Sequence, residues 1–291
     1  MPTNSIIQLN WSHTSVAQLP ALESGVVYVV YVPLCVNGKS VLSDSQRLIA
    51  IELLSDIQWD RFERRPIGPS KESYLTGRYY LLQLLAQFSK IQPESITLSY
   101  NRLNKPFLEP NPQGLEFNFT DTSIARDMRH GGGIESVGLF AFTLKSHVGV
   151  DIEAAHRTAA SDKIAERRFT AHEHAFYTNG SVGANLKNES AKKHEERTTK
   201  DERFLHLWTR KEAFGKACGL GINFKMNQLN LMASPGAGDA RLDQHAFEYQ
   251  QQAWRLQQFY GPQNEIACIS YAGSQTLEIQ AFQIDPELDS A

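Results

Sequence analysis

Two carboxylates, Asp151 and Glu153, stand two positions apart in an otherwise apolar stretch of the chain. Residues two apart share one face of an extended strand, so this spacing predicts that the two carboxylates lie side by side. Such a pair of hard oxygen donors can ligate an octahedral Mg²⁺ ion when a substrate phosphate and water complete the shell. Ordinary surface acids on a half-exposed strand alternate in the same way, and this segment alone fits both interpretations.

A second set of chemically capable residues, Trp208, Glu212 and Lys216, recurs at intervals of four just before Gly219-Leu-Gly221. This spacing predicts one stripe along a helix that the glycines end, with a carboxylate one turn from a cation and an aromatic ring one turn the other way. The alternative is an i,i+4 salt bridge on a solvated face, which contributes little stability. Because tryptophan is costly to expose, the stripe favours a partly buried acid and cation beside a pocket.

Together, the two segments resemble the signature of the phosphopantetheinyl transferases, in particular their long two-lobed type. Asp151-x-Glu153 is followed about 55 residues later by Trp208-x-x-Lys211-Glu212-Ala213-x-x-Lys216, with the spacing of that family. The similarity covers roughly residues 70 to 225. Its other parts follow in the family's order: Gly77-Arg78, Asn104-Lys105-Pro106-Phe107-Leu108, Phe117-Asn118-Phe119-Thr120-Asp121-Thr122, and then Arg157, Phe169 and Glu173.

The resemblance implies transfer of the 4′-phosphopantetheine group from coenzyme A to a serine of an apo acyl or peptidyl carrier protein, with 3′,5′-ADP leaving. Asp151, Glu153 and Glu212 would share a Mg²⁺ ion, and Glu212 is also the candidate that accepts the serine proton. Lys216 would contact the pyrophosphate and stabilise the leaving group. Trp208 is expected to be a packing platform for the catalytic helix.

Coenzyme A contacts are implied for Arg78 and Lys105, at the nucleotide phosphates, and for Thr120, which keeps the hydroxyl of the family's usual serine. The chain departs from the family at two of these segments. Asn104 replaces a glycine, a mild change because asparagine tolerates turn conformations. Asp121 stands where the family usually has a histidine, and a carboxylate repels phosphate unless a metal ion or backbone N–H groups intervene.

The elements that must position these residues can be predicted from hydrophobic periodicity and turn signals. Strands are expected near 25–33, 115–120, 137–144, 148–153, 266–271 and 277–284, and helices over 43–64, 69–88, 160–177 and 204–218. This predicts an α+β fold, and the resemblance implies two similar lobes, each a small antiparallel sheet packed with helices. We place the N-terminal lobe at 1–145 and the C-terminal lobe at 146–291, with a polar insertion near 179–203.

Composition limits the possible partners. The 291 residues have a formal net charge of −3, which gives no global electrostatic reason to expect nucleic acid or an anionic membrane. Three widely spaced cysteines indicate neither a disulfide framework nor a thiolate metal site, and a cytoplasmic protein without a membrane span is expected. The resemblance also implies that the protein is a monomer, because the two lobes of one chain in this family already form a pseudo-dimer.

Two other functions remain open from the sequence. One is a catalytically weak protein that binds coenzyme A or a nucleotide, in which Asp121 has reduced turnover. The other is a metal-dependent phosphoanhydride hydrolase that uses the same carboxylates with water as the acceptor. Retention of Asp151, Glu153, Glu212 and Lys216 argues against the first, while the family resemblance argues against the second. The carrier protein that the enzyme would serve is not encoded in any of these motifs.

Overall fold

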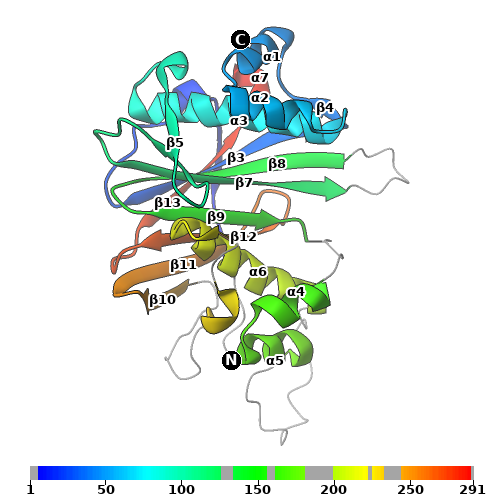
Figure 1. Cartoon of the computed structure of the whole chain (residues 1–291), viewed down its shortest axis with the longest axis vertical. Helices are drawn as coiled ribbons and strands as arrows, with labels where there is room; N and C mark the ends of the chain where they lie inside the picture. Colours follow the sequence, from blue (N-terminus) through cyan, green and yellow to red (C-terminus); the bar gives the residue numbers. More distant parts are fainter. Residues whose placement is uncertain are drawn as a thin grey trace, which may run out of the picture.

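Two β-sheets pack face to face at the centre of the molecule, and helices cover the outer surface of each sheet (Figure 1). The computed structural model describes residues 6–125, 134–155, 161–180, 199–221, 225–232 and 244–289. Valines of the two sheets, among them Val27 and Val29 on one side and Val148 and Val150 on the other, form the core between them. The fold is therefore a four-layer arrangement of helices, sheet, sheet and helices.

The first sheet is built around a long apolar strand, β3 (Val26–Val36), which pairs antiparallel with β8 (Ile134–Leu144). β8 in turn pairs antiparallel with β7 (Leu115–Ala125), the edge strand that lies nearest the second sheet. On its other side β3 pairs in parallel with a strand from the end of the chain. The remaining members of this sheet are β13 (Glu278–Ile284), β2 (Trp11–Thr14) and the short β4 (Lys39–Ser40).

The second sheet carries the predicted acidic strand, β9 (Val148–Glu153), at its edge. β9 pairs antiparallel with β12, and β12 pairs antiparallel with β11. On its other side β11 pairs with β1, a strand from the start of the chain. The bounds of these strands are β12 (Ile266–Ala272), β11 (Gln252–Tyr260), β10 (Gln244–Tyr249) and β1 (Ile7–Gln8). A separate hairpin consists of β5 (Leu98–Tyr100) and β6 (Pro106–Leu108).

Two long helices cover the sheets. α3 (Pro69–Ser89) packs leucines and Phe88 on the first sheet, and α6 (Lys200–Ala217) packs Phe214 and two alanines on the second. The other helices are α1 (Asp44–Glu52), α2 (Asp56–Glu63), α4 (Ser161–Arg168), α5 (Ala171–Asn179) and α7 (Pro286–Asp289), with single 3₁₀ turns at Val16–Gln18, Pro93–Ser95 and Met226–Gln228. In the described part of the chain, no helix has the length and apolar character that crossing a bilayer requires.

The α+β class is confirmed, with details that differ from the expectation. The single helix predicted over 43–64 is two helices, because Ser55 caps a new one by accepting a hydrogen bond from the backbone N–H of Gln58. The helix predicted over 160–177 is likewise two, α4 and α5, because Thr170 caps the second. The sheets are mainly antiparallel, but β13 pairs in parallel with β2 and β3, and β1 pairs in parallel with β11. Since β13 lies in the first sheet and β1 in the second, each sheet receives a strand from the opposite end of the chain. The division near residue 145 remains a prediction, and most of the predicted insertion lies outside the described residues.

Gly149 sets the distance between β9 and α6. A side-chain carbon at this position would overlap the backbone of Ala213 and Ala217, so only glycine permits the observed approach. Because Asp151 and Glu153 follow on the same face of β9, this approach also fixes how near α6 comes to the carboxylates. Gly149 is therefore the residue that sets the spacing of this contact.

We predict that Gly149→Ala lowers the free energy of unfolding by at least about 2 kcal/mol, because two backbone segments must separate to admit the methyl group. Chemical denaturation followed by circular dichroism measures this. Gly77→Ala in the middle of α3 is the matched control, since the new methyl group meets only Leu34 at 3.8 Å. The control should be stabilised by roughly 0.5–1 kcal/mol through helix propensity. Equal stability of the two variants would contradict the close-packing argument.

Candidate functional site

The two carboxylates of β9 are buried and face α6. Asp151 is 4% exposed and Glu153 is 6% exposed, which excludes the alternative of ordinary surface acids on a half-exposed strand. The alternating residues Val148, Val150 and Ile152 point the other way, into the core between the sheets. Burial of two acids on one face is costly unless cations or hydrogen-bond donors meet them, so their partners define the site.

The stripe predicted on α6 supplies those partners. Lys216 Nζ lies 2.7 Å from Asp151 Oδ1 and also donates to the carbonyl of Val150, at 3.2 Å. Two turns earlier, Trp208 Nε1 donates to Glu153 Oε1 at 3.1 Å, and its ring stacks on Phe204. Trp208 thus both packs and positions a carboxylate, and the whole stripe faces the acidic strand.

Glu212 lies on the same stripe between Trp208 and Lys216. Burial raises the pKa of its carboxyl group, and the nearby charge of Asp151 raises this pKa further, while Lys216 and Arg168 oppose the shift. The negative charges of Asp151, Glu153 and Glu212 therefore act on one another. Among the described residues, no group of three or more His, Cys, Asp or Glu side chains is arranged to hold a metal ion as it stands. Instead, Lys216 provides the positive charge beside Asp151.

The edge strand β7 of the first sheet completes this cluster. Asn118 Oδ1 accepts a hydrogen bond from the backbone N–H of Val150 at 3.0 Å, which ties β7 to β9. Thr120, expected to contact coenzyme A, donates its hydroxyl to Asp151 Oδ1 at 3.3 Å. The structure thus brings Thr120 together with Asp151 and Lys216.

Lys105 is held at the end of α6. Its ammonium donates to the carbonyls of Val148 and Ala217, both at 3.0 Å, and Ala217 is the last residue of α6. The carbonyl end of a helix carries partial negative charge, so this is a favourable place for a cation. Burial nevertheless lowers the pKa of Lys105, since removal from water penalises the charged form. The hairpin of β5 and β6 is thereby anchored to both β9 and α6.

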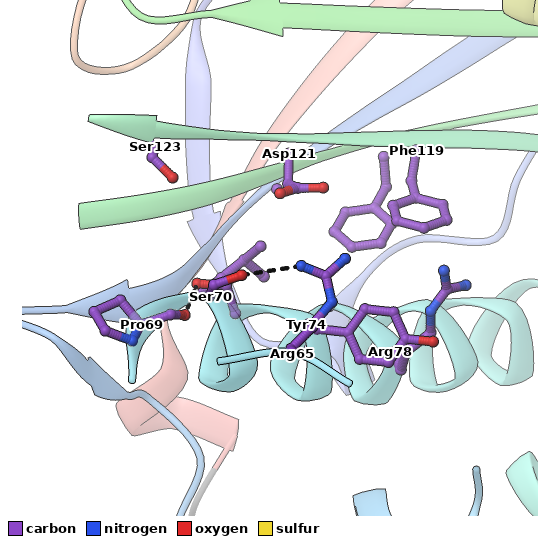
Figure 2. Close-up of a pocket in the computed structure, with 13 residues that line it drawn as sticks. Arg65, Pro69, Ser70, Tyr74, Arg78, Phe119, Asp121 and Ser123 are labelled. Carbon is purple, nitrogen blue, oxygen red and sulfur yellow. Dashed lines mark hydrogen bonds between the residues drawn. The ribbon is translucent and has the colours of Figure 1, made fainter. Parts of the chain in front are cut away.

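Arg78 lines a pocket of about 380 Å³ between α3 and the first sheet (Figure 2). Its guanidinium lies 4.9 Å from the ring centre of Phe119 and 5.1 Å from that of Tyr74. Arg65 also lines this pocket. Its guanidinium lies 4.6 Å from the ring centre of Tyr74 and donates a hydrogen bond of 3.1 Å to Ser70 Oγ. The Nε atom of Arg78 is buried and has no hydrogen-bond partner in the described part of the chain.

Thr120 and Asp121, which are neighbours on β7, face two different parts of the site. Thr120 is buried and faces Asp151, whereas Asp121 is exposed and points from the opposite face of the strand into the pocket beside α3 (Figure 2). The three predicted cations are likewise separated: Lys216 lies at the carboxylate cluster, Lys105 at the end of α6, and Arg78 in the pocket. The site is therefore a carboxylate cluster and a cationic pocket on the two sides of β7.

Several residues of the site were not singled out from the sequence. Arg65 and Tyr74 precede the motif segments, and only their positions before and on α3, with Tyr74 one turn ahead of Arg78, could have indicated them. Asn118 was quoted within a motif, but its bond to Val150 depends on the packing of the two sheets. The sequence motif residue Arg157 lies outside the described residues.

Comparisons with known proteins point to one family. Residues 147–271 match the model of the 4′-phosphopantetheinyl transferase superfamily. The chain is 24% identical over 220 residues to the 4′-phosphopantetheinyl transferase HetI of Nostoc sp., covering 76% of this chain and 79% of that protein. It is also 26% identical over 211 residues to a phosphopantetheinyl transferase of Thraustochytrium sp., covering 68% of this chain and 62% of the relative.

The raised pKa of Glu212 generates a prediction about stability. The pKa of Glu212 is raised in the folded protein above its value in the unfolded chain. As the pH rises through the folded pKa, this group lowers the free energy of unfolding, because its carboxyl group ionises more easily in the unfolded chain. Glu212→Gln should therefore melt a few degrees higher than the wild type at pH 8 in a chelating buffer. This gain should shrink as the pH falls toward the ordinary glutamate pKa of about 4.3, where the folded and unfolded forms both bind the proton.

Differential scanning calorimetry across pH 4 to 8, roughly the range between these limits, measures the difference. Glu166→Gln on α4 removes the same charge from an exposed position and serves as the control, with an unchanged melting temperature expected. If Glu212→Gln melts lower than the wild type at pH 8, its carboxylate is stabilised in the cluster and the argument from like charges is wrong.

Proposed function

We propose that the chain is a transferase of the 4′-phosphopantetheinyl transferase type, the family to which it is similar. Its proposed donor is coenzyme A, and its proposed acceptor is a serine of an apo acyl or peptidyl carrier protein. In the proposed reaction, the serine Oγ forms a bond to the β-phosphorus of coenzyme A, and 3′,5′-ADP leaves. The observation that supports this most is the cluster of the buried Asp151 and Glu153 with the half-buried Glu212 beside Lys216.

We propose Asp151, Glu153 and Glu212 as the residues that hold Mg²⁺. Their donor chemistry fits, because hard carboxylate oxygens are the ligands that Mg²⁺ takes from proteins. Their electrostatics fit as well, since a divalent cation would offset both the burial and the mutual repulsion that raise the pKa of Glu212. When bound, Mg²⁺ supplies charge neutralisation to the pyrophosphate oxygens during transfer.

The proton and the leaving group are assigned to α6. Glu212 is our candidate to accept the serine proton, since a raised pKa brings its carboxylate closer to the range of an effective general base. Lys216, one turn further, lies on the same face and can place its ammonium on the oxygen of the departing 3′,5′-ADP. Its present bond to Asp151 keeps this cation next to the carboxylates until a phosphate arrives.

We assign the nucleotide end of coenzyme A to the pocket beside α3. Arg78 and Arg65 lie there with aromatic rings, and this combination suits a phosphate next to a flat base. Lys105 and Thr120 are further proposed contacts, from the side of β9. Each of them would exchange its present partner for a phosphate oxygen: the carbonyls of Val148 and Ala217 for Lys105, and Asp151 for Thr120.

The acceptor class follows from the reaction, since acyl and peptidyl carrier proteins of fatty-acid, polyketide and nonribosomal peptide synthesis are modified at a serine. We propose that the enzyme acts on one of these in the cytoplasm as a monomer. The net charge of −3 provides no general attraction to nucleic acid or to an anionic membrane surface.

Intact-protein mass spectrometry of an apo carrier protein, incubated with the enzyme, coenzyme A and Mg²⁺, tests the proposal. The carrier should gain the mass of one phosphopantetheine. Asp151→Asn and Glu212→Gln should each reduce the rate by a factor of about 10² to 10³, and the double variant should lose little more, because ligands of one ion act as a unit. Glu166→Gln is the control and should transfer at the wild-type rate.

Two outcomes would contradict this proposal. Hydrolysis of coenzyme A without any change in the carrier would favour a metal-dependent hydrolase that uses the same carboxylates. Transfer at a normal rate by Asp151→Asn would show that the carboxylate cluster does not support the chemistry.

The pocket assignment predicts a separate effect on affinity. Arg78→Ala should raise the KM for coenzyme A about tenfold and change kcat little, because the residue binds ground state and transition state alike. Tyr74→Phe, which keeps the ring under both guanidinium groups and loses only the hydroxyl, should leave the KM unchanged. Steady-state kinetics with varied coenzyme A measures both values, and an unchanged KM in Arg78→Ala would remove the nucleotide from this pocket.

A further inference from the structure

The carboxylate of Asp121 lies in a pocket that also holds two guanidinium groups (Figure 2). It is exposed, and within the described residues it forms neither a salt bridge nor a hydrogen bond. Ser70 and Arg65 lie across the pocket from it, on the side of α3. A carboxylate that no protein group neutralises is available to accept hydrogen bonds from a bound ligand.

The two arginines of this pocket are not matched with Asp121. Arg65 donates to Ser70 and lies over Tyr74, while Arg78 lies over Tyr74 and Phe119. Neither guanidinium comes within 4.0 Å of a carboxylate among the described residues. The pocket therefore offers two cations for an anionic ligand and, separately, one carboxylate that requires a donor.

This arrangement suits a nucleoside diphosphate with an unmodified ribose better than one with an additional ribose phosphate. An acidic side chain accepts hydrogen bonds from ribose hydroxyls, whereas ribose phosphates are met by arginine, as dinucleotide-binding enzymes illustrate. A phosphate beside Asp121 would place like charges together. The diphosphate remains free to pair with the arginines in either case.

We propose that Asp121 is a specificity-determining residue, which accepts a hydrogen bond from the ribose 3′-hydroxyl of the donor and so removes the advantage of a 3′-phosphate. The enzyme then uses dephospho-coenzyme A at least as well as coenzyme A. This inference rests on the proposed function, because it places the nucleotide end of the donor in the pocket beside α3.

The test compares the two donors with the full-length wild type and with Asp121→Asn, which keeps the shape of the side chain and removes its charge. We expect a wild-type kcat/KM for dephospho-coenzyme A equal to or greater than that for coenzyme A. Asp121→Asn should improve kcat/KM for coenzyme A on the order of tenfold and leave dephospho-coenzyme A unchanged or weakened. Isothermal titration of each donor in the absence of carrier protein should give the same reversal in Kd.

Two controls separate the local effect of Asp121 from general charge and from packing. Glu94→Gln removes one negative charge beyond the far end of α3, and Ser123→Ala alters the same face of β7 without changing charge. Both should keep the wild-type ratio of the two donors. A wild type that prefers coenzyme A by tenfold or more, or a ratio that Asp121→Asn does not move, overturns the inference.

The outcomes also distinguish this inference from the proposed function. Loss of affinity for both donors in Asp121→Asn would show that the carboxylate binds a group that they share, such as the adenine amine, and would overturn the role at the 3′ position while transfer itself stood. Failure of transfer from either donor, together with no binding of either, would remove the proposed function and this inference with it.

Discussion

The close approach of α6 to β9 is the contact on which the rest of the site depends. Gly149 permits this approach because a larger residue would overlap the backbone of Ala213 and Ala217. At this separation, Lys216 reaches Asp151, Trp208 reaches Glu153, and Lys105 joins the end of the helix to the start of the strand. The geometry of the carboxylates is thus a consequence of backbone packing. The hydrogen bonds between the carboxylates and α6 would be lost if the helix moved outward by the width of a methyl group.

The packing of α6 on β9 brings the negative charges of Asp151, Glu153 and Glu212 together, and this arrangement adds little to the stability of the fold. Burial and like charge raise the pKa of Glu212, and Lys216 offsets only part of this cost. A fold selected for stability alone would replace such acids with neutral residues, whereas a site that must bind a cation and a diphosphate benefits from them. The cluster and the arginine pocket lie on opposite faces of β7, so under the proposed function one strand would position both ends of the extended donor.

The sequence predicted the parts of this arrangement that depend on local periodicity. Alternation along β9 correctly placed Asp151 and Glu153 on one face of a strand, and the four-residue interval on α6 correctly placed Trp208 and Lys216 on one stripe of a helix. Interactions between distant segments were not predictable. β11 was missed because its central residues Gln257 and Gln258 read as polar, although both are buried and Gln258 is hydrogen-bonded to Arg210 of α6. The exchange of terminal strands between the sheets, and the pocket built from α3 and β7, likewise follow from packing rather than from any single motif.

In the proposed enzyme, Asp151, Glu153 and Glu212 form one cation site at which Lys216 meets the pyrophosphate. A crystal structure of the enzyme with coenzyme A and Mn²⁺, which takes the place of Mg²⁺ and is visible by anomalous scattering, tests it most directly. We expect a single anomalous peak among these three carboxylates, with the Lys216 ammonium on a phosphate oxygen of the donor. An anomalous peak elsewhere, with Lys216 still bound to Asp151, would contradict it.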